Sequence, residues 1–155
     1  LKNSKGENIL MMDADFSHPP DYIPTLINEL RNDDDCDIVI ASRYMKGGKI
    51  IGWPLTRRIL SKGATFLTQF LLKLEFSEIM SGFYIFRKKI LTNVEFSTNG
   101  QKFLLELLVK SNYKKVKEIP MTFKNRTAGK SKFNFSDIKN FISSLIELRK
   151  FKKIK

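Results

Sequence analysis

The hydrophobic pattern begins with a short unbroken apolar run that ends abruptly in acids. Residues 9–12 read Ile-Leu-Met-Met, and Asp13 follows directly. A continuous apolar run of this length favours a strand that is buried on both faces, as in a parallel sheet covered by helices. After Pro19 and Pro20, apolar residues recur at helical spacing over residues 22–30, and a proline near a helix start does no harm. We therefore predict a strand, a turn and a helix.

A second apolar segment completes a strand–helix–strand unit. Residues 37–41 read Asp-Ile-Val-Ile-Ala, are rich in β-branched side chains and have acids on their N-terminal side. Such a segment is typical of a strand, and two strands that flank one helix predict an α/β fold. Gly47 and Gly48 then begin a stretch that we interpret as a flexible loop reaching Pro54.

Further elements are expected along the rest of the chain: helices over residues 54–75, 103–110 and 136–151, strands over residues 83–86 and 116–123, and a polar loop over residues 125–132. Pro120 indicates that the last strand lies on a sheet edge, because proline cannot donate to a neighbouring strand. Each long helix has an apolar stripe, formed by Leu60, Ala64, Leu67, Leu71 and Leu74 in the first and by Ile138, Phe141, Ile142, Leu145 and Leu148 in the second.

Length and composition limit the number of domains. A chain of 155 residues with 42% hydrophobic content can bury one core. It has no apolar run of ~18–20 residues, the length that spans a bilayer. We expect residues 1–132 to be the C-terminal part of a larger domain, and residues 133–155 to form an amphipathic basic helix that faces a membrane. Because the sequence starts at Leu1, we also expect it to be part of a longer chain.

The cysteine count and the net charge limit the redox compartment and the kinds of binding partner that fit the chain. Cys36 is the single cysteine, which excludes an internal disulfide and fits a reducing compartment. The formal net charge of +12 asks for an anionic partner, and nucleic acid, an anionic membrane surface and a phosphorylated substrate all qualify. A nucleic-acid-binding module would expose aromatic residues beside clustered cations, whereas the 13 Phe fall mostly within apolar periodic segments. We therefore expect no nucleic acid partner and retain that module as an alternative.

The most informative polar motif is Asp13-Ala14-Asp15 at the end of the first strand. Side chains two residues apart on an extended backbone project to the same side, so both carboxylates can face one point. In open α/β sheets, ligands bind at the carboxyl edge of the strands. Paired carboxylates suit Mg²⁺ or Mn²⁺, and Ser17 could add a weak oxygen ligand. The alternative is that the acids only cap the following turn, and we interpret His18 as a turn residue rather than a ligand.

Several motifs in this order resemble those of the dolichol-phosphate mannosyltransferases, within the family-two group of inverting GT-A glycosyltransferases. The matching blocks are Asp13-Ala14-Asp15-Phe16-Ser17-His18-Pro19-Pro20, Ala41-Ser42-Arg43-Tyr44, Gly52-Trp53-Pro54-Leu55 with Arg57 and Arg58, Met80-Ser81-Gly82-Phe83, Lys102-Phe103-Leu104-Leu105-Glu106-Leu107-Leu108, Glu118-Ile119-Pro120-Met121-Thr122-Phe123, and Arg126-Thr127-Ala128-Gly129-Lys130-Ser131-Lys132. One departure is Glu78-Ile79, where relatives usually carry Asp-Pro, and it leaves the geometry of that loop open.

The resemblance implies a partial GT-A, Rossmann-like fold that lacks its N-terminal strands and most nucleotide contacts. It implies a GDP-mannose donor, a divalent cation, a polyprenyl (dolichyl) phosphate acceptor and inversion at the anomeric carbon. It also implies a protein bound peripherally to the cytosolic face of a membrane, with a small membrane-anchor subunit as a further candidate partner. On this interpretation the chain alone is inactive or needs the missing part to fold stably.

The acceptor chemistry suggests which residues carry the reaction. A phosphate monoester is largely dianionic at neutral pH, so it needs positioning rather than a general base. Guanidinium groups bind phosphate in a planar, bidentate way. Asp13, Asp15 and Arg43 are the predicted catalytic residues, with Asp13, Asp15 and Ser17 on the metal. The predicted acceptor-phosphate ligands are Arg43, Arg57 and Arg126, with Ser61 and Lys132 as lesser candidates.

Two further hypotheses concern the lipid and the sugar. Both long helices pair an apolar stripe with cations, which is typical of helices that lie in a membrane interface, although stripes of this kind also complete protein cores. We expect the outer edges of these helices and the basic tail at residues 150–155 to meet the membrane. A glucosyl or aminosugar transferase acting on polyprenyl phosphate, and a catalytically dead remnant of a transferase, remain alternatives.

Overall fold

The main sheet has four strands in the order β1-β4-β2-β5. The computed structural model describes residues 3–96, 102–125 and 135–154. Its sheet consists of β1 (Asn8–Met11), β2 (Cys36–Ser42), β4 (Tyr84–Arg87) and β5 (Lys115–Pro120). β4 is antiparallel to β1 and β2, whereas β2 and β5 are parallel. β1, β2 and β5 therefore point the same way, and their carboxyl ends lie along one edge of the sheet.

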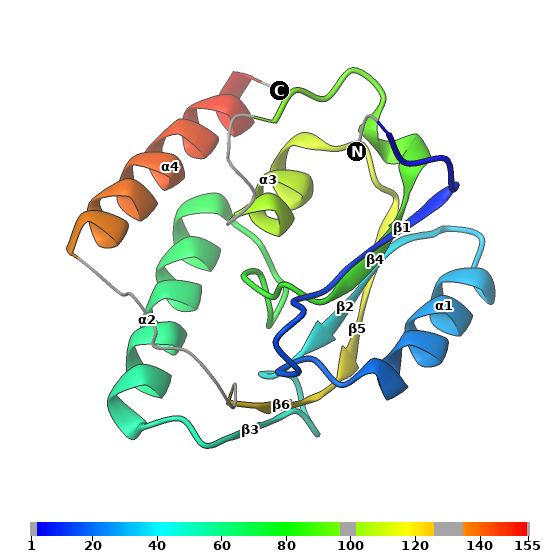
Figure 1. Cartoon of the computed structure of the whole chain (residues 1–155). Coiled ribbons are helices and arrows are strands. Elements are labelled where there is room, and N and C mark those ends of the chain that lie inside the picture. Colours follow the sequence, from blue (N-terminus) through cyan, green and yellow to red (C-terminus); the bar gives the residue numbers. More distant parts are fainter. Residues whose placement is uncertain (1–2, 97–101, 126–134, 155) are drawn as a thin grey trace.

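Helices cover both faces of this sheet (Figure 1). They are α1 (Ile23–Arg31), α2 (Leu55–Leu72), α3 (Phe103–Lys110) and α4 (Phe135–Ile154), with single turns η1 (Pro20–Tyr22) and η2 (Lys88–Leu91). α1 packs on one face through Leu26 and Leu30. The other face contributes Ile38 and Phe86 to the larger core, which α2, α3 and α4 cover. The predicted strand–helix–strand unit and the α/β fold are confirmed, with β4 inserted between its two strands.

Two predictions about the strands are wrong in detail. The stretch from Gly47 to Pro54 is not only a loop, because it contains β3 (Lys49–Ile51), which pairs in parallel with β6 (Thr122–Lys124). The strand predicted over residues 116–123 is therefore two strands in different sheets. The switch occurs at Met121, whose backbone N–H donates to Ser42 while its carbonyl accepts from Lys49. Pro120 correctly indicated that β5 is an edge strand.

β1 is less buried than its sequence suggested. Within it only Ile9 is buried, and its partner strand is antiparallel. The reason is its place at the end of the sheet, where the chain gives it one strand neighbour among the described residues. The unbroken apolar run therefore predicted the strand correctly. The prediction that this strand is buried on both faces was wrong.

The apolar stripe predicted for the first long helix is confirmed only in part: Leu74 is buried and Leu71 packs against the core. In α2 the buried residues are Thr65, Thr68 and Leu72, while Leu60 and Leu67 are exposed. The helix ends at Leu72 rather than near residue 75, because Lys73 adopts a left-handed backbone conformation with φ of 48°. In α4, Leu145 and Leu148 are buried as expected, but Ile142 is exposed. Both helices have more apolar positions than the core can cover.

Candidate active site

The carboxyl ends of β1 and β2 open into a cavity of about 680 Å³. Loops that follow these strands supply Asp13 and Arg43, and the first turn of α2 supplies Arg57. The cavity is lined by Met12, Asp13, Ala14, Asp15, Ser17, His18, Arg43, Trp53, Arg57, Met80, Gly82, Phe123 and Asn125. The structure thus brings together five of the predicted site residues, two of them acidic, two basic and one a serine.

The turn after β1 fixes Asp15 by local hydrogen bonds. Its Oδ1 accepts from the backbone N–H of Ser17 at 3.1 Å and from the Ser17 hydroxyl. Ser17 is buried, while Phe16 between them has φ of 60° and projects into solvent. A non-glycine residue in this conformation is uncommon and persists where its surroundings enforce it. Asp15 therefore caps its turn, as expected if the acids had only that role. Asp15 also lines the cavity, so capping is not its only possible role.

The Asp13 carboxylate has room in the cavity because residue 82 is a glycine. A Cβ at Gly82 would lie 3.0 Å from Asp13 Oδ1 and 3.1 Å from Oδ2. The Asp13 side chain is 61% exposed. The Ser-Gly-Phe turn, which precedes β4, thus leaves space for the acid at the end of the neighbouring strand.

His18 holds the backbone of the acidic motif by a hydrogen bond. Its Nδ1 accepts the backbone N–H of Asp13 at 3.0 Å, and its ring stacks on Phe83 and meets the edge of Phe123. Burial lowers the pKa of His18, although the Asp13 carboxylate opposes that shift. A neutral ring can accept at Nδ1, so the hydrogen bond and the direction of the pKa shift agree. Sequence reasoning treated His18 as a turn residue and missed this contact.

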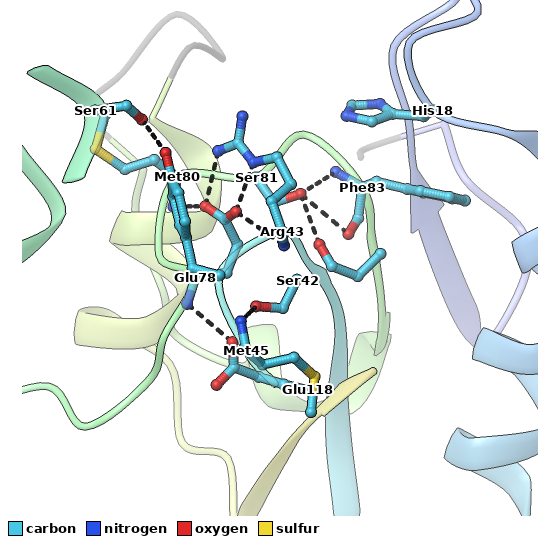
Figure 2. Close-up of polar contacts among 12 residues, drawn as sticks. His18, Ser42, Arg43, Met45, Ser61, Glu78, Met80, Ser81, Phe83 and Glu118 are labelled. Atoms are coloured by element: carbon cyan, nitrogen blue, oxygen red, sulfur yellow. Dashed lines mark hydrogen bonds and ion pairs between the residues drawn. The ribbon is translucent and has the colours of Figure 1, made fainter. Parts of the chain in front are cut away.

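Arg43 is held in place on several sides. Its Nε donates to Glu78 Oε2 at 2.6 Å and its Nη2 to Oε1 at 2.9 Å (Figure 2). The rings of Tyr44, Trp53 and Phe123 have their centroids 5.2–5.3 Å from the guanidinium carbon. Burial lowers the pKa of Arg43, but the hydrogen bonds and charge of Glu78 outweigh burial and raise it overall. Arg43 is therefore charged, and its guanidinium group is bound by Glu78 and packed among three aromatic rings.

Arg57 has a looser setting at the same cavity. Its guanidinium carbon lies 4.0 Å from the centroid of the Trp53 ring, and Nη1 donates to Asn125 Oδ1 at 3.3 Å. The Trp53 ring therefore lies near both guanidinium groups, that of Arg43 from the loop after β2 and that of Arg57 from the first turn of α2. Arg57 is half-buried, whereas the side chain of Arg43 is 9% exposed.

The remaining predicted ligands lie elsewhere. Ser61 accepts a hydrogen bond from the Tyr44 hydroxyl at 2.7 Å and does not line the cavity (Figure 2). It therefore reaches the site through Tyr44, the neighbour of Arg43. Arg126 and Lys132 lie outside the described residues.

A second cavity of about 400 Å³ adjoins the first at Asp13 and Gly82. Its walls include Lys102 and Phe103 at the start of α3, and Tyr84 on β4. Burial raises the pKa of Tyr84, so its hydroxyl remains protonated at neutral pH. Asp13 therefore lies between a space lined by two arginines and a second space with both polar and apolar walls.

The fold and the sequence define the class of protein. A family model described as glycosyl transferase family 2 matches residues 1–94. This chain belongs to glycosyltransferase family 2. A crystal structure of glucosyl-3-phosphoglycerate synthase from Mycobacterium tuberculosis, in complex with Mn²⁺, uridine diphosphate and phosphoglyceric acid, aligns with a TM-score of 0.60 at 15% identity. The alignment covers 94% of this chain and 48% of that chain, which confirms the expectation of a partial GT-A fold.

Sequence relatives narrow the class further. The chain is 39% identical over 153 residues to the dolichol-phosphate mannosyltransferase of Pyrococcus furiosus, covering 97% of this chain and 43% of that protein. It is 33% identical over 149 residues to the polyprenol monophosphomannose synthase of Mycolicibacterium smegmatis, covering 92% of this chain and 56% of that protein. The chain thus spans about half the length of these curated relatives, and the predicted family resemblance is confirmed.

Proposed function

We propose that this chain is part of an inverting mannosyltransferase that moves mannose from GDP-mannose to a polyprenyl (dolichyl) phosphate. The observation that carries the proposal is the convergence of two carboxylates and two guanidinium groups on one cavity. A reaction between two phosphorylated substrates needs both signs of charge, one for the metal and one for the acceptor. The mannosyl and polyprenyl specificities are supported by the names of the relatives.

Asp13 and Asp15 would hold Mg²⁺ or Mn²⁺ against the donor diphosphate. Carboxylate oxygens are the donors that these hard ions prefer, and Gly82 leaves space beside Asp13 for a ligand sphere. Within the described residues no third His, Cys, Asp or Glu joins them, so water and phosphate oxygens would complete the coordination. The bound ion would neutralise charge on the nucleotide leaving group. Ser17 donates to Asp15 and would mainly orient it.

Arg43 and Arg57 would hold the acceptor phosphate. That phosphate is largely dianionic at neutral pH and attacks without a general base. An acceptor oxygen forms the bond to the anomeric carbon as the bond from that carbon to the diphosphate breaks, and GDP leaves with its electron pair. Attack from the face opposite the leaving group inverts the anomeric centre. The protein contributes orientation, which is worth several orders of magnitude in rate.

Contact with a membrane surface is supported by the exposed apolar residues on the outer face of α2. Its exposed apolar residues are Leu55, Ile59, Leu60, Phe66, Leu67 and Phe70, and Ile142, Ile146 and Phe151 are exposed on α4. Apolar exposure on this scale commonly marks an interaction surface, and nearby lysines and arginines suit anionic headgroups. α2 begins beside the cavity at Arg57, so the lipid tail could leave the site along this face. In the described part of the chain, no helix combines the length and apolarity required to cross a bilayer.

The direct test is a transfer assay with the complete enzyme. GDP-[³H]mannose and polyprenyl phosphate in detergent should yield labelled lipid, and chelator should abolish the reaction until Mg²⁺ or Mn²⁺ is restored. Uridine diphosphate glucose serves as the competing donor, and a lipid diphosphate serves as the control acceptor. Equal activity in chelator would overturn the metal role, and preferential use of the glucose donor would overturn the sugar assignment.

A further inference from the structure

The loop between α2 and β4 buries a carboxylate that the proposed reaction does not use. Glu78 is completely buried, and both of its oxygens engage Arg43. It also accepts the backbone N–H of Met80 at 3.3 Å. A buried carboxylate is retained at a cost in desolvation unless it is paired and hydrogen-bonded, as this one is. Because Glu78 binds the guanidinium group of an arginine that lines the cavity, it can set the orientation of that group.

A second carboxylate holds the loop itself. Glu118 on β5 accepts the backbone N–H of Ser77 and the backbone N–H of Glu78, each at 2.8 Å. Figure 2 shows the second of these contacts. β5 pairs directly with β2, and Ile40 is opposite Glu118 in the register. The loop is therefore clamped to the same sheet that carries Arg43. Glu118 is not among the described residues that line the cavity.

We propose that Glu118 and Glu78 act in series as positioning residues for Arg43. Glu118 fixes the backbone of the loop, and Glu78 then fixes the plane of the guanidinium group. Nη1, the nitrogen that Glu78 does not engage, points away from Glu78 and is the edge left to meet an anion (Figure 2). The identification of that anion as a lipid phosphate rests on the proposed function; the positioning itself does not.

This arrangement divides the work between the two arginines. Arg43 is neutralised nearby by Glu78, so it offers directed hydrogen bonds more than net charge. Arg57 is half-buried, stacks on Trp53 and donates a 3.3 Å hydrogen bond to Asn125, so its guanidinium group is more exposed than that of Arg43 and can adjust to an incoming anion. Arg43, held in one orientation, would set the direction of attack. Arg57, which can adjust, would capture the acceptor phosphate. The first should govern kcat and the second KM for the acceptor.

Trp53 provides a readout that does not depend on catalysis. It is the single tryptophan of the chain, and its ring lies 5.3 Å from the Arg43 guanidinium carbon and 4.0 Å from that of Arg57. Indole emission responds to a cation over the ring, so a displaced guanidinium group should shift it. Titration with inorganic phosphate or pyrophosphate then reports anion capture in the same site.

The experiment compares Glu118→Ala and Glu118→Gln with Glu29→Ala as the control, in the complete enzyme, with Trp53→Phe as the fluorescence blank. Glu29 is an exposed acid that pairs with Lys117, next to Glu118 on the same strand. We expect Glu118→Ala to lower kcat on the order of tenfold to a hundredfold, with less than about a twofold change in acceptor KM, and to shift Trp53 emission. Glu118→Gln keeps one acceptor oxygen and should lie between Ala and wild type. Arg57→Ala should show the opposite split.

Two results would overturn the proposal. One is a Glu118→Ala enzyme with wild-type kcat and Trp53 emission; the other is a loss of kcat that only follows a lower Tm while emission and phosphate titration stay normal. If Glu118→Ala does not fold, normal kcat and emission in Glu118→Gln and in Glu78→Asp would overturn it instead. If the enzyme does not transfer mannose, the emission shift and the phosphate titration still decide the positioning role, so the two proposals fail separately.

Discussion

The two ends of β2 both carry charges of both signs, but they use them differently. At its amino end, acids pair directly with lysines at 2.8–3.0 Å: Asp33 with Lys115, Asp35 with Lys114, and Asp37 with Lys89. At its carboxyl end, Asp13 and Arg57 both line a cavity, and the buried pair of Arg43 and Glu78 stands behind it. The pairs made by Asp33 and Asp35 lie at the surface, where ion pairs contribute little stability, and the buried Asp37 is paired with the exposed Lys89. The charged side chains that line the cavity are placed where they can bind a ligand.

The largest effect should come from Asp15→Asn. Amide substitution keeps the acceptor oxygen for Ser17 but removes the charge that would hold the metal. The loss of several kcal/mol of charge stabilisation corresponds to a fall on the order of a thousandfold in kcat, with Tm nearly unchanged. Transfer assays and thermal melts of the complete enzyme measure both. Asp35→Asn, at the other end of β2, is the control and should retain full activity; comparable losses in both variants would erase the distinction between the two ends.

A smaller effect is expected from Gly82→Ala. The added Cβ would press on the Asp13 carboxylate at 3.0 Å and displace it, which should lower kcat on the order of tenfold to a hundredfold. Gly63→Ala is the matched control, because its Cβ would meet nothing within 4 Å. In the interior of α2 that change should raise stability by about 0.5–1 kcal/mol and leave transfer unchanged. Wild-type kcat in Gly82→Ala would show that the Asp13 position is not critical.

A change of about tenfold is expected in vesicle binding when the outer face of α2 becomes polar. Phe66 and Phe70 are 70% and 73% exposed, so Phe66→Ser/Phe70→Ser should keep the fold and lose lipid contact. Flotation with anionic liposomes measures the bound fraction of the complete enzyme. The double leucine variant at the same positions should float like wild type. If the serine variant also floats normally, the membrane contact lies elsewhere, and binding that requires another membrane protein would indicate an anchor subunit.

The smallest effect concerns the paired end of β2. Hydrogen bonds from Lys115 and Lys117 lower the pKa of Asp33 from 3.8 to about 2. A depressed folded-state pKa contributes stability above the unfolded value, and that contribution is lost as pH falls from about 3.8 through about 2. Because Asp33 is half-buried and its partner Lys115 is exposed, solvent screens the pair and the effect should be small. Melting curves of wild type and Asp33→Asn across that interval should converge at the acid end, and a constant difference would contradict the shift.

Local patterns in the sequence were sufficient for elements whose surroundings are simple. α3 spans Phe103–Lys110, as predicted, and nearly every residue in it is buried. Pro120 marked the edge strand because its missing donor acts wherever it stands. β3 and β6 escaped notice because three-residue strands carry little periodicity and their pairing joins segments about seventy residues apart. The sequence did not decide which residues of the α2 stripe face the core and which face outward, because an apolar side chain gives the same pattern in both places.

The candidate site divides in the same way. Asp13, Asp15, Ser17, Arg43 and Arg57 could be selected from motifs, and all five line one cavity. Glu78 could be noticed only as an unusual residue before the Ser-Gly-Phe turn, and its partner lies 35 residues away. Ser61 was predicted as a lesser phosphate ligand because it lies four residues after Arg57 on the same helix, yet its hydroxyl accepts a hydrogen bond from Tyr44 and does not line the cavity. Spacing along a helix predicts which side chains share a face, but not which neighbour faces them.

The order and chemistry of the motifs determined, without any coordinates, that this chain has an α/β sheet with acids and arginines at its carboxyl edge. Those features follow from backbone geometry within a few residues: alternation along a strand, the turn of a helix, the donor that proline lacks. Only the folded chain decided that Glu118 holds the loop that holds Glu78, that Gly82 makes room for Asp13, and that α2 turns its aromatic residues outward. These depend on contacts between distant segments, whose free energies are set by packing and burial rather than by neighbours in the sequence.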